Sequence, residues 1–418
     1  MIACGLDFGT WNSSIGVARE EGAELVPVEA DSKLLPSAVF FDYETRSRVL
    51  FGTEAVLAYV GQTEGRLMRA LKSILGSSLI DEETSLGGRK VPLTKVVELF
   101  VQHLKDRAEA FAGREIATLV HGRPVRFVDD DDVADARAEN VLAAIARRVG
   151  FREVAFVYEP IAAAHDYERT VQSEELALIA DLGGGTSDFS VVRVGPQRRG
   201  RAHRGSDVLA NAGVRVGGTD FDAALSLASV MPLLGLGSRL IEKNLPMPNA
   251  PYHELAAWAT INFAYTHKNE REIAELVALA VEPGKVERLL KLVRQRLGHR
   301  LAFAVEEAKI ALSTEPDAAV DLTFLEAALG VMPTRGRFDR TIGDMMDRLH
   351  RTARDCIAAA GVKPAAIDTI FLTGGSSRVP AVRAAVARAA PSARLAGGSD
   401  LLSVAMGLTQ MAGYRSSS

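Results

Sequence analysis

Two stretches of the chain share one pattern of apolar and polar positions. In the first, two apolar runs flank the turn DFGTWNSS at 7–14, and in the second they flank the turn DLGGGTSDFS at 181–190. Apolar runs joined through a glycine turn predict paired β-strands. A third strand is expected at 37–42 in the first half and at 207–216 in the second. The pattern therefore predicts that each half opens with a β-meander.

Helical spacing of apolar residues follows each meander. It predicts helices at about 53–76 and 93–111 in the first half, and a long, mainly helical segment at about 221–313 in the second. Shorter strands and helices complete the two halves. They are expected as strand 117–127, helix 133–150, strand 152–160 and helix 161–171, and later as a strand and helix from 368 and a closing helix at about 401–411. The sequence thus predicts a duplicated α/β architecture.

Composition places the chain among ordinary globular proteins. Its 418 residues are too many for one core and predict two or three domains. The net charge of −4 gives no electrostatic footprint for nucleic acid. Two cysteines, Cys4 and Cys356, are too few for a disulfide framework, and no leader peptide or membrane-spanning apolar run is evident. We therefore expect a cytoplasmic protein without nucleic-acid or membrane partners.

The two turns contain the residue types that hold a phosphate group. Glycine lets a phosphate approach backbone N–H groups, and Thr10 and Thr186 add hydroxyl donors. Asp7 and Asp181 offer oxygen atoms to Mg²⁺, directly or through water. One such turn alone would most often be an ordinary hairpin, but two facing copies could hold one triphosphate between them.

Seven motifs, in order along the chain, resemble those of the heat-shock seventy chaperone family. They are DFGTWNSS, LKSILG at 71–76, EPIAAA at 159–164, DLGGGTSDFS, GGTDFD at 217–222, EEAKIALS at 306–313 and LTGGSSRVP at 372–380. The resemblance is to the ATPase domain of that family and runs from Ile2 to about Met411. It implies a duplicated actin-like (ribonuclease H-like) α/β fold, with ATP or ADP and Mg²⁺ in a cleft between two lobes.

The resemblance also implies a domain organisation. Lobe I would span 1–173, with an inserted helical segment at about 38–112, and would be completed by the C-terminal helix at about 401–413. Lobe II would span 174–400, with an inserted helical segment at about 223–305.

The family's catalytic and phosphate-binding roles fall on residues of this sequence. Asp7 and Asp181 would position hydrated Mg²⁺, Lys72 would place the attacking water, and Glu159 would orient water or the metal shell. Without the motifs, Lys72 would be interpreted as a solvated helix residue, and Glu159 or Asp188 as a cap. The phosphate-binding residues would be Gly9, Thr10, Trp11, Asn12, Gly183, Gly184, Gly185, Thr186 and Asp188.

Three of these motifs resemble the family's adenosine pocket. Backbone at Gly217, Gly218, Gly374 and Gly375 could approach a flat base closely, with Ser376 beside it and Arg378 able to stack on it. Glu306, Lys309 and Ser313 match positions that hold ribose and adenine, although a solvated helix face is the alternative for these three.

Three departures from the family pattern affect the expected activity. Trp11 stands where the family usually has a second threonine, which puts the catalytic rate in doubt, and Ile310 replaces an arginine that flanks adenine. After the final GLTQMAGYRSSS we expect no interdomain linker and no peptide-binding β-sandwich. In this the chain resembles the short, YegD-type branch of chaperone-like proteins.

These observations predict an ATP-binding, slowly ATP-hydrolysing molecular switch that acts with a protein partner or client. A filament-forming actin-like protein and a small-molecule kinase of the same superfamily remain alternatives. The oligomeric state is not indicated by the sequence.

Two charged segments are not assigned to function. QRRGRAHR at 197–204 is interpreted as a solvated loop because no aromatic residues are interleaved with its arginines. The aspartates at 129–132 are interpreted as the start of a helix because the glycine and distal glutamate of a Ca²⁺ loop are missing.

Overall fold

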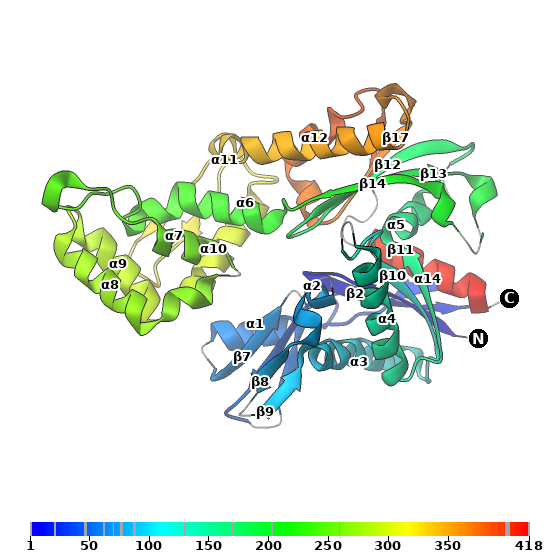
Figure 1. The fold of residues 1–418 in the computed structure, drawn as a ribbon, viewed down its shortest axis with the longest axis horizontal. Helices are drawn as coiled ribbons and strands as arrows, with labels where there is room; N and C mark the ends of the chain where they lie inside the picture. Colours follow the sequence, from blue (N-terminus) through cyan, green and yellow to red (C-terminus); the bar gives the residue numbers. More distant parts are fainter. Residues whose placement is uncertain are drawn as a thin grey trace.

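The computed structural model describes most of the chain and shows two central β-sheets with helices around them (Figure 1). The described residues are 2–20, 22–45, 48–61, 63–69, 71–75, 78–86, 89–128, 131–168, 171–199, 201, 204–258, 260–397 and 402–416. Gly76 of the LKSILG motif, the aspartates at 129 and 130 and the predicted boundary at 400–401 lie outside them.

The first sheet has the strand order β11-β10-β1-β2-β3, and β4 also pairs with β2. Strands β1 and β2 are antiparallel around the DFGTWNSS turn, and β1 is parallel to β10 on its other side. The bounds are β1 Ala3–Phe8, β2 Asn12–Arg19, β3 Gly22–Leu25, β4 Leu35–Pro36, β10 Thr118–Arg123 and β11 Glu153–Tyr158.

The second sheet repeats the topology of the first, with the order β18-β17-β12-β13-β14. Strands β12 and β13 are antiparallel around the second glycine turn, and β12 is parallel to β17. The bounds are β12 Glu175–Leu182, β13 Ser187–Val194, β14 Val208–Val214, β17 Thr369–Thr373 and β18 Arg394–Gly397. Strand for strand, β1 corresponds to β12 and β10 to β17, which confirms the duplicated architecture.

Helices cover both faces of the first sheet. On one face α3 (Leu93–Ala112) and α4 (Asp132–Arg148) pack over the apolar side chains of β1 and β2. Asp131 caps α4 by accepting a hydrogen bond from the Ala134 backbone N–H at 2.9 Å, as expected for a helix start. On the other face lie α5 (Glu159–Glu168) and α14 (Ser403–Ser416), which overlap the helices predicted at 161–171 and at about 401–411.

The two sheets share one layer of core through these last two helices. Its buried side chains come from α5 and α14, from Ala3 and Val120 of the first sheet, and from Ile179 and Phe371 of the second. The outer face of the second sheet is covered by α12 (Gly343–Ala359) and α13 (Pro380–Ala387). This shared layer of buried side chains joins the two halves of the molecule.

Close packing of α14 on α5 requires a glycine. A Cβ atom at Gly407 would lie 1.9 Å from the Ala162 carbonyl oxygen. We predict that Gly407→Ala lowers the free energy of unfolding by about 1–3 kcal/mol, measured by urea denaturation. Gly413→Ala in the same helix is the control, because its Cβ would meet nothing closer than 3.4 Å and alanine favours helix there. Equal stability of the two variants would contradict this packing.

The inserted segment of the first half is not purely helical, and two sequence predictions fail there. The strand near 37–42 is β5 (Ala38–Asp42), but it belongs to a separate sheet of order β6-β5-β7. The helix expected at 53–76 stops at Val60. Its bounds and those of the neighbouring elements are β6 Val49–Phe51, α1 Gly52–Val60, β7 Gly65–Arg69, α2 Lys72–Leu75, β8 Glu83–Leu86 and β9 Arg89–Pro92.

Both errors have a physical reason. The third strand of the first meander is β3, whose four residues GAEL are too few and too polar to produce an alternating signal. Leu67 has helical spacing from neighbouring apolar residues, but in the structure it packs from β7 against the cluster of Phe40 and Leu50. A short apolar stretch is compatible both with helical spacing and with the alternation of a strand, and here pairing with β5 makes it a strand.

The inserted segment of the second half is mainly helical, as predicted, and forms the arm at the left of Figure 1. It leads back through two short strands and α11 to the second sheet. The bounds are α6 Gly218–Leu225, α7 Ala250–Ala256, α8 His267–Leu279, α9 Pro283–Arg294, α10 Gly298–Ala311, β15 Val320–Asp321, β16 Gly330–Val331 and α11 Arg335–Thr341.

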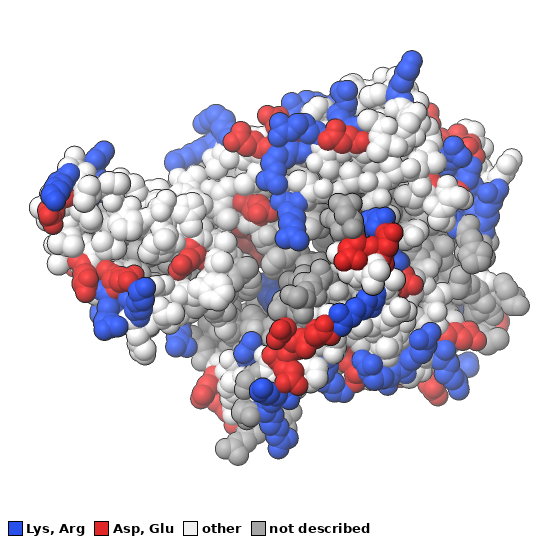
Figure 2. All heavy atoms as spheres, viewed as in Figure 1, with Lys and Arg blue, Asp and Glu red and all other residues white. Residues whose placement is uncertain are grey.

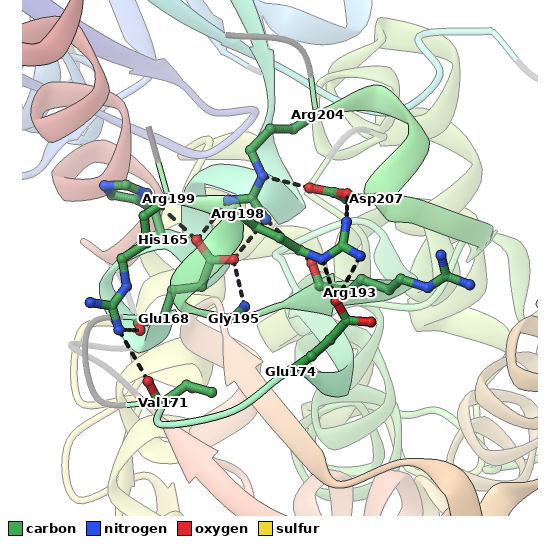
Figure 3. A network of polar contacts seen from close by, with 10 residues as sticks. All are labelled: His165, Glu168, Val171, Glu174, Arg193, Gly195, Arg198, Arg199, Arg204 and Asp207. Atoms are coloured by element: carbon green, nitrogen blue, oxygen red, sulfur yellow. Dashed lines mark hydrogen bonds and ion pairs between the residues drawn. The ribbon is translucent and has the colours of Figure 1, made fainter. Parts of the chain in front are cut away.

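The segment predicted as a solvated loop at 197–204 is solvated only in part, because Arg201 is exposed whereas Arg204 is buried. Arg204 is buried and donates to both carboxylate oxygens of Glu168, at 2.6 and 2.7 Å, and to Asp207 at 2.7 Å (Figure 3). Arg198 pairs with Glu174 at 2.8 Å. These contacts tie the connection between β13 and β14 to the end of α5. Local composition could not show this, because Glu168 lies 36 residues before Arg204.

The distribution of charged and apolar residues bears on the expectation of no nucleic-acid or membrane partners in two respects. On the face shown in Figure 2, basic and acidic side chains are interspersed. Among the described residues, no helix combines the length and the apolar character that a membrane span requires.

Candidate functional site

Asp7 and Asp181 occupy equivalent places in the two sheets. Asp7 lies near the end of β1 and Asp181 near the end of β12, each just before its glycine turn. Burial raises the pKa of Asp7 to about 8, and the charge of Glu159 acts in the same direction. Burial likewise raises the pKa of Asp181 to about 7, again helped by Glu159. The two halves therefore bring two carboxyl groups into one electrostatic environment.

Lys72 lies within this environment. Its Nζ is 2.6 Å from Oε1 of Glu159, and both side chains are largely buried. Burial acts to lower the pKa of Lys72, but the charges of Glu159 and Asp7 outweigh it and raise this pKa. Glu159 is the first residue of α5 and comes directly after β11, close to the predicted strand end. The cluster contains three carboxyl groups but only one ammonium, so it is suited to bind a further cation.

The raised carboxyl pKa values predict how stability depends on pH. Above about pH 4, the unfolded chain, with a pKa of 3.8 at both residues, has released protons that the folded protein still holds, at Asp181 up to about pH 7 and at Asp7 up to about pH 8. Stability of the nucleotide-free protein should therefore fall as the pH rises through this range. We expect Asp7→Asn to reduce this slope, measured by urea unfolding at pH 5, 6, 7 and 8. An unchanged slope in the variant would contradict the assignment.

In the second glycine turn, the backbone carbonyl groups of Gly183 and Gly184 accept hydrogen bonds from neighbouring residues. The Gly183 carbonyl accepts from the Ser376 hydroxyl at 2.8 Å, and the Gly184 carbonyl accepts from the Thr219 backbone N–H at 2.7 Å. In the part of the chain that the structure describes, the N–H groups of Gly184 and Gly185 have no acceptor. A row of free N–H groups in a turn is suited to an anion.

Neighbouring residues fix the conformations of both turns. Thr186 donates its hydroxyl to Asp188 at 3.0 Å, and a Cβ at Gly217 would lie 2.6 Å from the Gly184 backbone, so only glycine fits there. In the first turn, Ser37 donates through its hydroxyl to the Gly9 carbonyl at 2.7 Å and through its N–H to the Trp11 carbonyl at 2.8 Å.

A cavity of about 1210 Å³ opens between the turns and α10. Its volume is ample for a nucleotide. The predicted residues that line it are Trp11, Asn12, Gly183, Gly184, Gly218, Glu306, Lys309, Ser313, Gly375, Ser376 and Arg378. The other predicted residues are not part of this lining. Most belong to the turns or to the carboxyl cluster: Asp7, Gly9, Thr10, Lys72, Glu159, Asp181, Gly185, Thr186 and Asp188. Gly217, before α6, and Gly374, after β17, pack against the backbone of the second turn.

On the α10 side of the cavity, Lys309 is held by an acid that sequence analysis left unassigned. Lys309 Nζ lies 2.8 Å from Oδ1 of Asp222 and donates to the Gly218 carbonyl at 3.3 Å. Asp222 is part of the quoted GGTDFD motif, so its position in the motif could have indicated a role. Ile310 lines the cavity with 58% of its surface exposed. Arg69 and Trp258 also line the cavity and lie in no motif.

Comparison with known proteins identifies the family. The sequence matches the model described as "Hsp70 protein" over residues 3–230 and 280–407. The chain belongs to the Hsp70 family. Its fold is accordingly the actin-like ATPase fold, in agreement with the duplicated sheets. The unmatched segment 231–279 falls in the helical arm, from just after α6 to the end of α8.

Similar relatives are chaperones. Two are chaperone proteins DnaK, from Thermotoga petrophila and from a Thermotoga species, strain RQ2. Each is 28% identical over 390 residues, which cover 91% of this chain and 54% of the relative. The chain therefore spans about half the length of these curated relatives. The Hsp70 family that it belongs to is one of chaperone-type ATPases.

Proposed function

We propose that this Hsp70-family chain binds ATP with Mg²⁺ between its two glycine turns and hydrolyses it slowly. The observation that carries the proposal is the cluster of Lys72, Glu159, Asp7 and Asp181 beside two turns. Free N–H groups next to this cluster suit a phosphate chain, and the adjoining cavity can take the nucleoside.

Asp7 and Asp181 offer the oxygen ligands that Mg²⁺ prefers. Within the described residues, no three His, Cys, Asp or Glu side chains converge closely enough to ligate one ion, so water would have to complete the shell. Asp7 and Asp181 would hold the ion with water in its shell, as Mg²⁺ usually keeps several waters. When bound, Mg²⁺ would neutralise charge on the phosphate oxygens.

Hydrolysis would depend mainly on positioning. A bond forms between a water oxygen and the γ-phosphorus, the bond to the β–γ bridging oxygen breaks, and ADP, phosphate and one proton are released. Lys72 would hold the attacking water and offset developing charge, and Glu159 would hold Lys72 in place through their 2.6 Å contact. Trp11 in place of a threonine removes one hydroxyl near the phosphates, which supports a low rate.

We further propose that nucleotide state controls the binding of a protein partner or client, as a switch in the cytoplasm. The relatives named chaperones favour this over a filament-forming protein or a small-molecule kinase. Opening and closing of the two halves around the nucleotide would carry the signal.

Phosphate release tests the proposed activity. Purified protein with ATP and Mg²⁺ is expected to release phosphate slowly, at a rate that needs no added small-molecule substrate. Asp181→Asn should lose this activity, because it removes a negative oxygen from the proposed metal site. Release that depends on an added sugar would instead support the kinase, and release unaffected by Asp181→Asn would contradict the site.

A further inference from the structure

The only two tryptophans of the chain both contact one arginine. The Arg69 guanidinium carbon is 4.9 Å from the ring centroid of Trp11 and 4.5 Å from that of Trp258. Arg69 is the last residue of β7, Trp11 lies in the first glycine turn, and Trp258 follows α7 in the helical arm. The stack therefore joins the two halves of the molecule across the cavity that all three residues line.

Among the described residues, Arg69 is a cation without a hydrogen-bonding partner. Its Nε is buried without an acceptor, and across the described residues no hydrogen bond or ion pair involves its guanidinium. Burial lowers the pKa of Arg69, and the charge of Glu306 only opposes this. The indole N–H of Trp11 is likewise buried without an acceptor. Buried donors normally have partners, so a cavity with two unmatched donors is suited to an anionic acceptor.

The position of these donors indicates which anion they could bind. A Cβ at Gly184 would lie 2.3 Å from Cδ1 of Trp11, and one at Gly185 would lie 3.5 Å from its Nε1. The N–H edge of the indole therefore faces the second glycine turn, where the backbone N–H groups are also free. Arg69 lies over the face of the same ring. A chain of phosphate oxygens between the turns could accept from all of these donors.

We propose that Arg69 binds the phosphate chain of the nucleotide, with its guanidinium plane held between Trp11 and Trp258. The inference rests on the proposed ATP-binding function. Trp258 lies in segment 231–279, which the family model does not match, so the stack is not explained by family membership. Stacking orders the guanidinium before the ligand arrives, which lowers the entropic cost of binding.

Titration calorimetry with ATP, ADP and adenosine in Mg²⁺ tests the proposal. Arg69→Gln is expected to weaken ATP and ADP binding by about 10- to 100-fold, because hydrogen bonds to charged groups are lost. Adenosine has no phosphate, so its affinity should stay within about twofold. Arg66→Gln is the matched control, because Arg66 lies on the same strand and is exposed outside the cavity. It should bind all three ligands like the parent protein.

Intrinsic fluorescence gives a second readout, since both tryptophans contact Arg69. ATP should change the emission of the parent protein, and Arg69→Gln should alter the free-state emission and reduce the change. If Arg69→Gln does not fold, Arg69→Lys serves instead. It keeps the charge without the planar stack and should show a smaller, still phosphate-dependent loss.

Several results would overturn the inference. Equal losses for ATP and adenosine would make Arg69 merely structural, and unchanged ATP affinity would remove it from the site. Tighter ATP binding in Arg69→Gln would mean that the stack blocks the turns. A parent protein that binds no ATP would contradict the proposed function itself, whereas ATP binding that is insensitive to Arg69 would contradict this inference alone.

Discussion

Lys72→Ala is expected to reduce ATP hydrolysis by about 100-fold or more while ATP remains bound. The Lys72 ammonium is the cation of a cluster that also contains Glu159, Asp7 and Asp181. Its removal takes away both the group that would hold the attacking water and the charge that would offset the transition state. Single-turnover phosphate release on protein preloaded with ATP measures the effect.

Binding and hydrolysis must be separated in this experiment. Lys95→Ala is the matched control, since Lys95 is half-exposed and pairs only at the surface with Glu98. It should hydrolyse ATP at the parent rate. A Lys72→Ala protein that keeps a rate within about twofold of the parent protein would remove Lys72 from the mechanism.

Arg204→Met is expected to lower the free energy of unfolding by about 3–5 kcal/mol, because it leaves the buried Glu168 carboxylate without its arginine. Asp207 keeps its ion pair with Arg198 in this variant. Glu168 is fully buried and accepts from Arg204 and from the Gly195 backbone N–H at 3.1 Å (Figure 3). Asp207 is also buried and accepts from Arg204. Urea unfolding measures the loss.

A second substitution separates the ion pair from general packing. Replacing Glu168 by leucine in the Arg204→Met background should recover part of the loss, because the uncompensated charge is removed. Arg201→Met is the control, since Arg201 is exposed in the same segment. If Arg204→Met and Arg201→Met unfold at the same urea concentration, the buried ion pairs do not stabilise the fold.

Much of the fold follows from patterns within single segments. The two glycine turns, the amphipathic helix α3 and the strands β10, β12 and β13 were all predicted from local periodicity and turn residues. Each of these segments contains its own signal, either alternation or helical spacing over many residues. The same holds for the site residues contributed by the turns, because glycine, aspartate and threonine lie together in the sequence.

The remaining features depend on contacts between distant segments. Strand β3 is only four residues long. Strand β5 was predicted as a strand but assigned to the wrong sheet, because strand pairing depends on contacts between distant segments. Arg204 bonds to Glu168, and Arg69 contacts Trp258, although the partners are far apart in the sequence and no local pattern links them. Charge composition predicted a solvated loop at 197–204. It could not indicate that Arg204 is buried, because the acids that pair with Arg204 lie outside this segment.

Hydrogen–deuterium exchange with and without ATP and Mg²⁺ tests the central claim most directly. If the nucleotide is held between the two turns, amides in both 7–14 and 181–190 should exchange more slowly when it is bound. The free N–H groups of Gly184 and Gly185 should be among those protected. Nucleotide binding that leaves both turns unprotected, or protects only one, would contradict the two-turn site.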